Sequence, residues 1–217
     1  GGLIPRNFLE LSNFAINVNG KKILRECHKL ANDAIENFNK PEHLVYYLCK
    51  LKNLLDTKDP LVPENHSHRI ILKQKQCSSA MVDCIALLPD LNFTHDIHYT
   101  GGNIEANLSI HKNENFHLTD IKHDIIAPFN TDLKFSNESK LASNRINYVY
   151  EGLITQKDSY QDLYKEWHGI ALEPEGIHAK LNFNINGTTF STNVIPKNNF
   201  AIIPDIIGSL ENDKIIN

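Results

Sequence analysis

The sequence predicts an α+β protein, in which an N-terminal helical hairpin packs on a curved antiparallel β-sheet, with a short later helix and a C-terminal β-hairpin. Three observations predict this class. Apolar residues recur every three or four positions within residues 20–56, and they alternate with polar residues through much of residues 69–156. An Asn-Gly dipeptide then separates two alternating runs near the C-terminus. We expect one domain over residues 1–217.

The helical hairpin is expected at residues 20–56, where Pro41 occupies a position that the first turn of a second helix accepts. Residues 20–58 carry an excess of three positive charges, which we interpret as a solvated outer face. The apolar faces that define the two helices are Ile23, Cys27, Leu30, Ala34 and Phe38 in the first, and Leu44, Leu48, Leu51 and Leu55 in the second.

A β-meander is expected at residues 69–156, after Pro60 and Pro63 have ended the second helix. The apolar runs at residues 70–72 and 82–88 resemble strands. Clear alternation follows on both sides of a Gly101-Gly102 turn, and a third strand from Phe116 shows one slip in register that is typical of a β-bulge. Residues 127–143 are expected to be a loose segment, and alternation resumes at Ile146.

The C-terminal part is expected to hold a helix at residues 158–168, followed by a β-hairpin and an edge strand at residues 178–204. The hairpin strands are residues 179–185 and 188–194, joined by Asn186-Gly187, and residues 200–203 form the edge strand.

Composition excludes several classes of protein. With 41% of its 217 residues hydrophobic, the chain has an ordinary globular composition. Its net charge is −4, so it lacks the excess of positive charge that is typical of nucleic-acid-binding proteins. No apolar run approaches the ~20 residues of a membrane-spanning helix. The Gly-rich phosphate-binding motifs are absent, and we expect no cofactor. Because the chain begins Gly1-Gly2 and Met81 is its one methionine, we expect that the original start has been removed.

Four cysteines, Cys27, Cys49, Cys77 and Cys84, are compatible with two disulfides or with four free thiols. Four Asn-x-Ser/Thr sequons add slight support for secretion, so a secreted and a cytosolic location stay equally open. His66 and His68 would share one face of a strand near Cys77 and Cys84, but the spacing of these two cysteines is unusual for zinc ligands. We therefore expect no metal site.

Two sets of residues are candidates for hydrolysis. Cys77 could open a helix and act as a nucleophile, with His98 or His117 as its base and Asp120 orienting that base. Alternatively, Tyr160, Tyr164 and Lys165 could cleave a phosphodiester without a metal, together with a distant histidine. Tyr160 and Tyr164 would share one helix face, from which Lys165 is rotated away.

The stretch from His98 to Ile110, with its Gly-Gly-x-Ile turn, and the stretch from Asn115 to His123 resemble insect takeout and juvenile-hormone-binding proteins. The tripeptide Asp59-Pro60-Leu61 is also similar to one in that family. The resemblance implies a long helix wrapped by a highly curved sheet, with an apolar ligand in a tunnel between them. The order of elements from about residue 86 also resembles the poxin nucleases of insect and vertebrate viruses, whose catalytic motifs are absent from this part of the chain.

The sequence therefore leads to three functional hypotheses. The first is binding of an apolar small molecule or lipid between the sheet and the helices, which need not be enzymatic. The second is hydrolysis by one of the two sets above, and the third is an effector that binds proteins through exposed strand edges. The first hypothesis rests on one apolar face of the sheet, whose expected ligand-binding residues are Ile97, Tyr99, Ile104, Leu108, Phe116 and Leu118.

Overall fold

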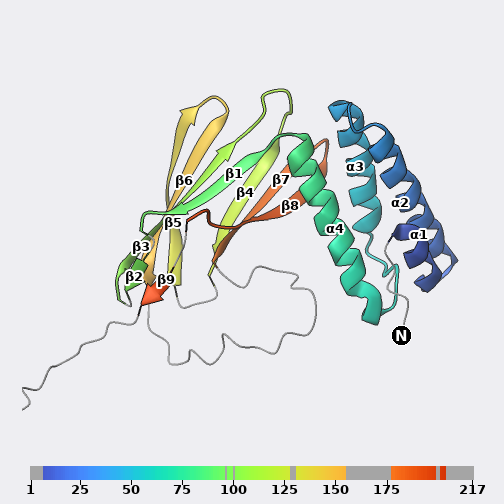
Figure 1. The fold of residues 1–217 in the computed structure, drawn as a ribbon, viewed down its shortest axis with the longest axis horizontal. Helices are drawn as coiled ribbons and strands as arrows, with labels where there is room; N and C mark the ends of the chain where they lie inside the picture. The colour runs from blue at the N-terminus through green and yellow to red at the C-terminus, as the bar shows by residue number, and fades with distance from the viewer. Residues whose placement is uncertain are drawn as a thin grey trace, which may run out of the picture.

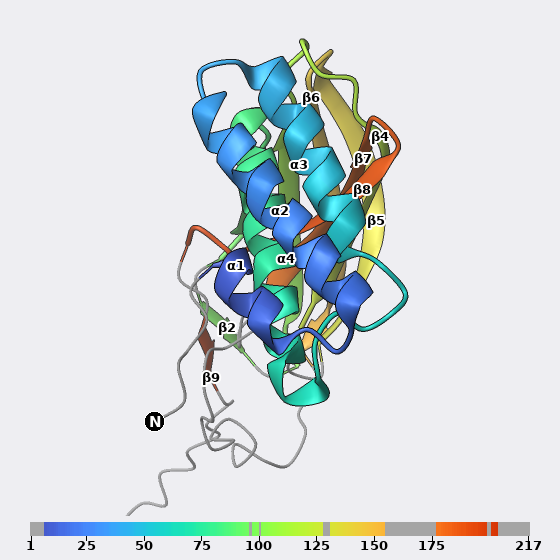
Figure 2. The same cartoon turned by 90° about the vertical axis from the view of Figure 1, so that its right-hand side faces the viewer.

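The structure is a computed structural model that describes residues 7–95, 97–99, 101–127, 131–154, 177–198 and 201–203, with the side chains of residues 97–99, 131–132 and 201–203 left aside. It has helices at the N-terminal side and strands after them (Figure 1). The helices and the strands form separate layers (Figures 1 and 2). The α+β class that the sequence predicts is thus confirmed.

The helical layer begins with α1 (Phe8–Leu11) and a 3₁₀ turn (Ser12–Phe14), followed by α2 (Val18–Glu36), α3 (Pro41–Leu55) and α4 (Glu64–Cys84). Asn17 caps α2, because its side chain accepts a hydrogen bond from the Gly20 amide at 2.8 Å. Gly20 also lets α2 approach the next loop closely, since a Cβ there would lie 2.9 Å from the Leu61 carbonyl oxygen.

The strands are β1 (Leu88–Phe93), β2 (Ile97–Tyr99), β3 (Asn103–His111), β4 (Thr119–Ile126), β5 (Thr131–Ala142), β6 (Arg145–Ile154), β7 (His178–Ile185), β8 (Thr188–Val194) and β9 (Ala201–Ile203). They form an antiparallel sheet of order β1-β3-β6-β5, an antiparallel sheet of order β4-β7-β8 and a parallel pair β2-β9. A parallel bridge from Leu91 to Pro196 connects β1 to the end of β8.

One hydrophobic core takes residues from both layers. Helices α3 and α4 both contact β8, and α2 lies outside them against α3. Met81 and Ile85 from the end of α4 belong to the same core as Leu91 of β1 and Leu181 of β7. The helical layer therefore covers the sheets mainly at β8.

Several sequence predictions are confirmed by the described elements. Helices α2 and α3 form the expected hairpin and bury Cys27, Leu30 and Leu48. Strands β7 and β8 form the expected hairpin, with Asn186 and Gly187 both at positive φ in the turn. The expected bulge is also present, since the register of β4 shifts between Thr119 and Lys122. Phe38, expected on the apolar face of the first helix, is exposed.

The prediction of strand-like structure at residues 70–72 is wrong, because these residues lie in the middle of α4. The β-meander accordingly begins at Leu88 rather than at residue 69. The helical periodicity of apolar residues is weak here, because Ile71 is exposed and polar residues fill most of the first three turns. The helix is held by packing: its buried residues Cys77, Ser78 and Met81 follow the three- and four-residue spacing.

Two expectations for the sheet are also wrong. Residues 127–143 were expected to be loose, but residues 131–142 form β5, which pairs with β6 along its length. Its polar sequence gives no alternation because its side chains are largely exposed. The strands flanking Gly101-Gly102 do not pair with each other: β2 pairs with β9, while β3 pairs with β1 and β6. The predicted helix at residues 158–168 lies outside the described residues.

Candidate functional site

The inner face of the β1-β3-β6-β5 sheet is a packed apolar surface. Register partners share a face, and here Ile104, Ala106, Leu108 and Ile110 of β3 lie opposite Gly152, Tyr150, Tyr148 and Ile146 of β6. Leu108 is 0% exposed and Ile104 is 1% exposed, so no space for a water molecule adjoins Leu108. Of the other expected ligand-binding residues, Phe116 and Leu118 are half-buried against the core, and the side chains of Ile97 and Tyr99 lie outside the description.

A polar cluster interrupts this inner face where β4 approaches β5 and β6. The His123 ring of β4 lies over Tyr148 with ring centroids 3.7 Å apart, and a hydrogen bond joins its Nδ1 to the Tyr150 hydroxyl. Phe135 of β5 closes the cluster at 5.8 Å from the His123 ring. Burial lowers the pKa of His123 and raises the pKa of Tyr150, so the neutral forms of both groups are favoured.

The outer face of the same sheet carries a row of polar side chains. The Asn107 side chain donates to the Glu105 carboxylate at 2.9 Å, the Asn147 side chain donates to Oδ1 of Asn107 at 3.3 Å, and the Ser109 hydroxyl donates to Oδ1 of Asn147 at 2.9 Å. Near the end of the row, Lys197 donates to Asp90 at 2.8 Å. Most of this face is thus internally satisfied.

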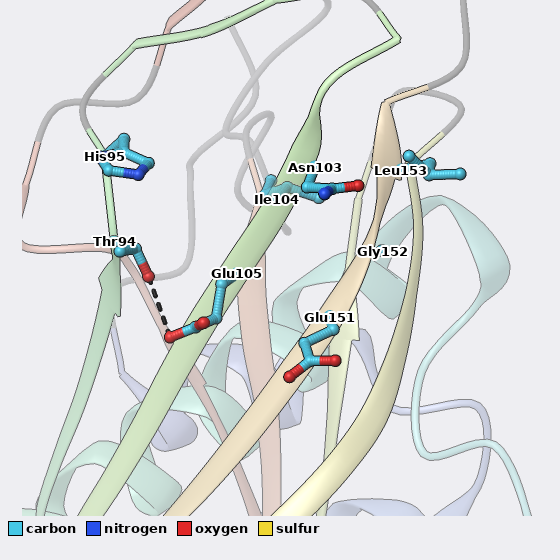
Figure 3. Close-up of a pocket in the computed structure, with 8 residues that line it drawn as sticks. All are labelled: Thr94, His95, Asn103, Ile104, Glu105, Glu151, Gly152 and Leu153. Atoms are coloured by element: carbon cyan, nitrogen blue, oxygen red, sulfur yellow. Dashed lines mark hydrogen bonds between the residues drawn. The ribbon is translucent and has the colours of Figure 1, made fainter.

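One end of the outer face is hollowed, and we take this hollow as the candidate functional site (Figure 3). Its volume is about 500 Å³. It lies where β3 and β6 pair beside the end of β1, and Figure 3 shows the carboxylates of Glu105 and Glu151 on the same side of the two strands. The lining residues are Thr94, His95, Asn103, Ile104, Glu105, Glu151, Gly152 and Leu153.

The two carboxylates of the hollow differ in their partners. Glu105 accepts hydrogen bonds at Oε1 from the Thr94 hydroxyl at 3.0 Å and from Asn107. Glu151 lies directly opposite Glu105 in register and accepts no hydrogen bond in the part of the chain that the structure describes. On its other side, Glu151 is the register partner of Lys134 in β5. Two like charges facing each other across neighbouring strands disfavour the fold.

This arrangement suits a cationic group better than an anion. The carboxylates of Glu105 and Glu151 supply acceptor oxygens, and Asn103 adds an amide within the same hollow. Leu153, half exposed at the rim, offers an apolar contact to whatever carries the cation. Lysine and arginine side chains have this combination of an apolar stem and a cationic end.

Cys77, the expected nucleophile, has the environment of a packing residue. It is 4% exposed, and its thiol donates to the Leu48 carbonyl oxygen of α3 at 3.4 Å. Burial raises the pKa of this thiol to about 12, so the thiolate that a nucleophile needs is disfavoured. Its described contacts do not join it to His117 or Asp120.

The other residues predicted for hydrolysis lie outside α4, the helix that carries Cys77. His117 is exposed in the loop before β4, and Asp120 is exposed at the bulge of β4 with a φ of 50°. His98 lies on β2, and its side chain is outside the description. Tyr160, Tyr164 and Lys165 also lie outside the described residues.

The remaining cysteines and histidines do not gather into a metal site within the described ranges, where no group of three or more metal-ligating side chains occurs. His66 and His68 lie on α4 rather than on a strand, so their side chains leave the helix in different directions. The four cysteines are free thiols, and burial raises the pKa of Cys27, like that of Cys77, to about 12.

Sequence reasoning did not single out Glu105, Glu151 or His123. The two glutamates lie on alternating strands at outward positions, where charged residues are ordinary. Only the β3–β6 register brings them together. His123 was one of 11 histidines, and the signal that could have found it is its place among the inward positions of β4, two residues before the buried Ile125.

Comparison of the sequence with protein-family models and with curated proteins found no match. The resemblances to takeout proteins and to poxins therefore stay predictions. Among the described helices, none combines the length and apolar character needed to cross a membrane.

Proposed function

We propose that this chain acts by binding a protein partner and that the hollow receives a lysine or arginine side chain of that partner. The observation that carries the proposal is the pair of carboxylates, Glu105 and Glu151, which face each other in register within an open hollow. A cation between them would turn a mutual repulsion into two charge-assisted hydrogen bonds. This develops the third hypothesis from the sequence, an effector that binds proteins.

The energy available from such a contact sets what it can do. An exposed ion pair contributes only ~0.2–1 kcal/mol, so the hollow selects a basic residue rather than supplying most of the affinity. Leu153 at the rim, an apolar side chain that is 50% exposed, supplies further contact area.

The other two hypotheses have less support from the described residues. An apolar ligand against Leu108 or Ile104 has to displace protein atoms, because these side chains are already covered. A thiol hydrolase needs an accessible thiolate, whereas the Cys77 thiol is buried with a raised pKa.

A titration followed by NMR tests the proposal. The probe is the capped tripeptide acetyl-Gly-Arg-Gly-amide, and the matched control peptide carries Gln in place of Arg. We expect the arginine peptide to shift backbone amide signals around Thr94, Glu105 and Glu151, and the glutamine peptide to leave them unchanged.

Variants complete the test. The double variant Glu105→Gln and Glu151→Gln should lose the response to the arginine peptide. Asp90→Asn should keep it, because Asp90 lies on the same face of the sheet but is already paired with Lys197. Equal responses to the two peptides, or a response that survives in the double variant, would contradict the proposal.

A further inference from the structure

A row of basic side chains lies on the exposed side of the first half of α2. Residues 18–32 hold four basic residues and a single acidic residue, Glu26. All four basic side chains are exposed, and none forms an ion pair or a hydrogen bond within the part of the chain that the structure describes. The members of this basic row are Lys21, Lys22, Arg25 and Lys29.

Arg25 lies at the centre of the basic row. Residues three or four apart are neighbours on a helix surface, and Lys22 precedes Arg25 by three residues while Lys29 follows it by four. Lys21, four residues before Arg25, adds a third positive neighbour. Like charges at these spacings destabilise a helix, and Glu26 offsets only part of this cost. The basic row and the two carboxylates of the hollow are thus unfavourable arrangements of opposite sign.

Each of the two charged surfaces also carries an exposed apolar side chain. Val18 precedes Lys22 by four residues, so it lies on the same side of α2, and it is 87% exposed. Leu153 at the rim of the hollow is half exposed. The basic row and the hollow are therefore complementary in charge, and both offer an apolar contact.

The two surfaces lie on opposite sides of the molecule. Helix α2 lies at the right of Figure 1 and faces the viewer in Figure 2, whereas the hollow lies at the start of β3, at the left of Figure 1. One chain therefore cannot place its own Arg25 in its own hollow. A contact between the two surfaces joins one copy to the next, and each copy contributes a different surface.

We propose that the partner of the hollow is a second copy of this chain, whose Arg25 enters between Glu105 and Glu151. The guanidinium is planar and carries five N–H donors, so it can donate to both carboxylates at once. Because the contact is head-to-tail, each copy of a pair keeps one surface free, and further copies add to form chains or a closed ring. This inference rests on the proposed function, since it names the partner that supplies the basic side chain.

Sedimentation velocity of the full chain over a range of protein concentrations tests the proposal. We expect the weight-average sedimentation coefficient to rise with concentration in about 0.1 M sodium chloride, where the Debye length is about 10 Å. The rise should disappear in about 1 M sodium chloride, where the Debye length is about 3 Å, because exposed charges are then screened. A coefficient that stays constant in the lower salt would overturn the proposal.

Two single variants assign the association to the basic row. Arg25→Gln should abolish the rise, whereas Lys40→Gln, which removes one charge from an exposed position outside the row, should retain it. Both side chains are exposed, so neither substitution disturbs the hydrophobic core. A rise that survives in Arg25→Gln would overturn the proposal.

Mixing two variants distinguishes a head-to-tail contact from a symmetric one. Arg25→Gln keeps the hollow but lacks the arginine, and the double variant Glu105→Gln and Glu151→Gln keeps the arginine but lacks the carboxylates. Each should stay monomeric alone, and an equimolar mixture should form pairs with one copy of each variant and no longer chains. A mixture that stays monomeric while the unmodified chain associates would overturn the proposal.

Failure of this inference is distinguishable from failure of the proposed function. If the unmodified chain stays monomeric but still responds to acetyl-Gly-Arg-Gly-amide, the second copy is ruled out and the hollow takes a basic side chain of another protein. If the chain stays monomeric and the peptide also gives no response, both proposals are wrong.

Discussion

The two faces of the β1-β3-β6-β5 sheet differ in whether their polar side chains have hydrogen-bond partners. On the inner face, the polar atoms of His123 and Tyr150 bond to each other within an aromatic cluster. At the hollow on the outer face, Glu151 faces Glu105 without a described hydrogen bond of its own. The register of β3 with β6 brings the two glutamates together, whereas His123 and Tyr150 come from strands of two different sheets that pack against each other.

This difference separates groups that serve the fold from groups available for binding. A satisfied polar pair in a low-dielectric interior stabilises one arrangement of the chain, and its loss leaves an orphaned partner. A pair of like charges in an open hollow does the reverse, because it costs stability until a cation arrives. Substitutions on the two faces should therefore change stability with opposite signs.

The largest effect is expected from Leu108→Ala on the inner face. Leu108 is fully buried, so the substitution removes apolar contacts and leaves a cavity, at a cost of about 2–5 kcal/mol in the free energy of unfolding. Urea denaturation measures this cost. Val149→Ala, on the outward side of β6, is the matched control and should cost clearly less; equal costs would contradict a packed inner face.

A smaller loss is expected from Tyr150→Phe. The ring still fills its place, but Nδ1 of His123 loses the hydroxyl with which it is bonded, and we expect a cost of about 1–3 kcal/mol. Combining this change with His123→Phe in a double-mutant cycle should show that the two effects are not additive. Additive costs would show that the hydrogen bond adds nothing to stability.

The pH dependence of stability should reflect His123. Burial lowers the pKa of His123 from its ordinary 6.5, partly offset by the carboxylates of Glu138 and Asp124. The unfolded chain therefore takes up the proton more readily, so this contribution is present above about pH 6.5 and is lost as pH falls through the folded-state pKa. His123→Gln should flatten that segment of the urea-midpoint profile; an unchanged profile would contradict it.

The smallest effect, and the one of opposite sign, is expected from Glu151→Gln. Removing one of two facing negative charges should raise the free energy of unfolding by ~0.2–1 kcal/mol. The gain should shrink in high salt, since the carboxylates are near solvent. A loss of stability would mean that Lys134, the register partner of Glu151 on β5, already compensates the charge.

The parts of the fold that could be predicted from the sequence are those that depend on a short stretch of residues. The three- and four-residue spacing of α2 and α3, the Asn186-Gly187 turn and the alternation of Ile104 to Ile110 each depend on a short window, and the structure has all three. Strand β5 and the first half of α4 were missed because partner elements, rather than their own patterns, hold them in place.

The candidate site could not be predicted for the same reason. Glu105 and Glu151 meet only through the register of β3 with β6, which is fixed by the apolar residues on the opposite face of the same strands.

The most direct test of the account measures stability and binding in one protein, the double variant Glu105→Gln and Glu151→Gln. We expect its urea midpoint to rise and its NMR response to acetyl-Gly-Arg-Gly-amide to disappear, since the two carboxylates oppose folding and attract the cation. A lower urea midpoint together with an unchanged response would contradict the account, because the glutamates would then serve the fold and not the partner.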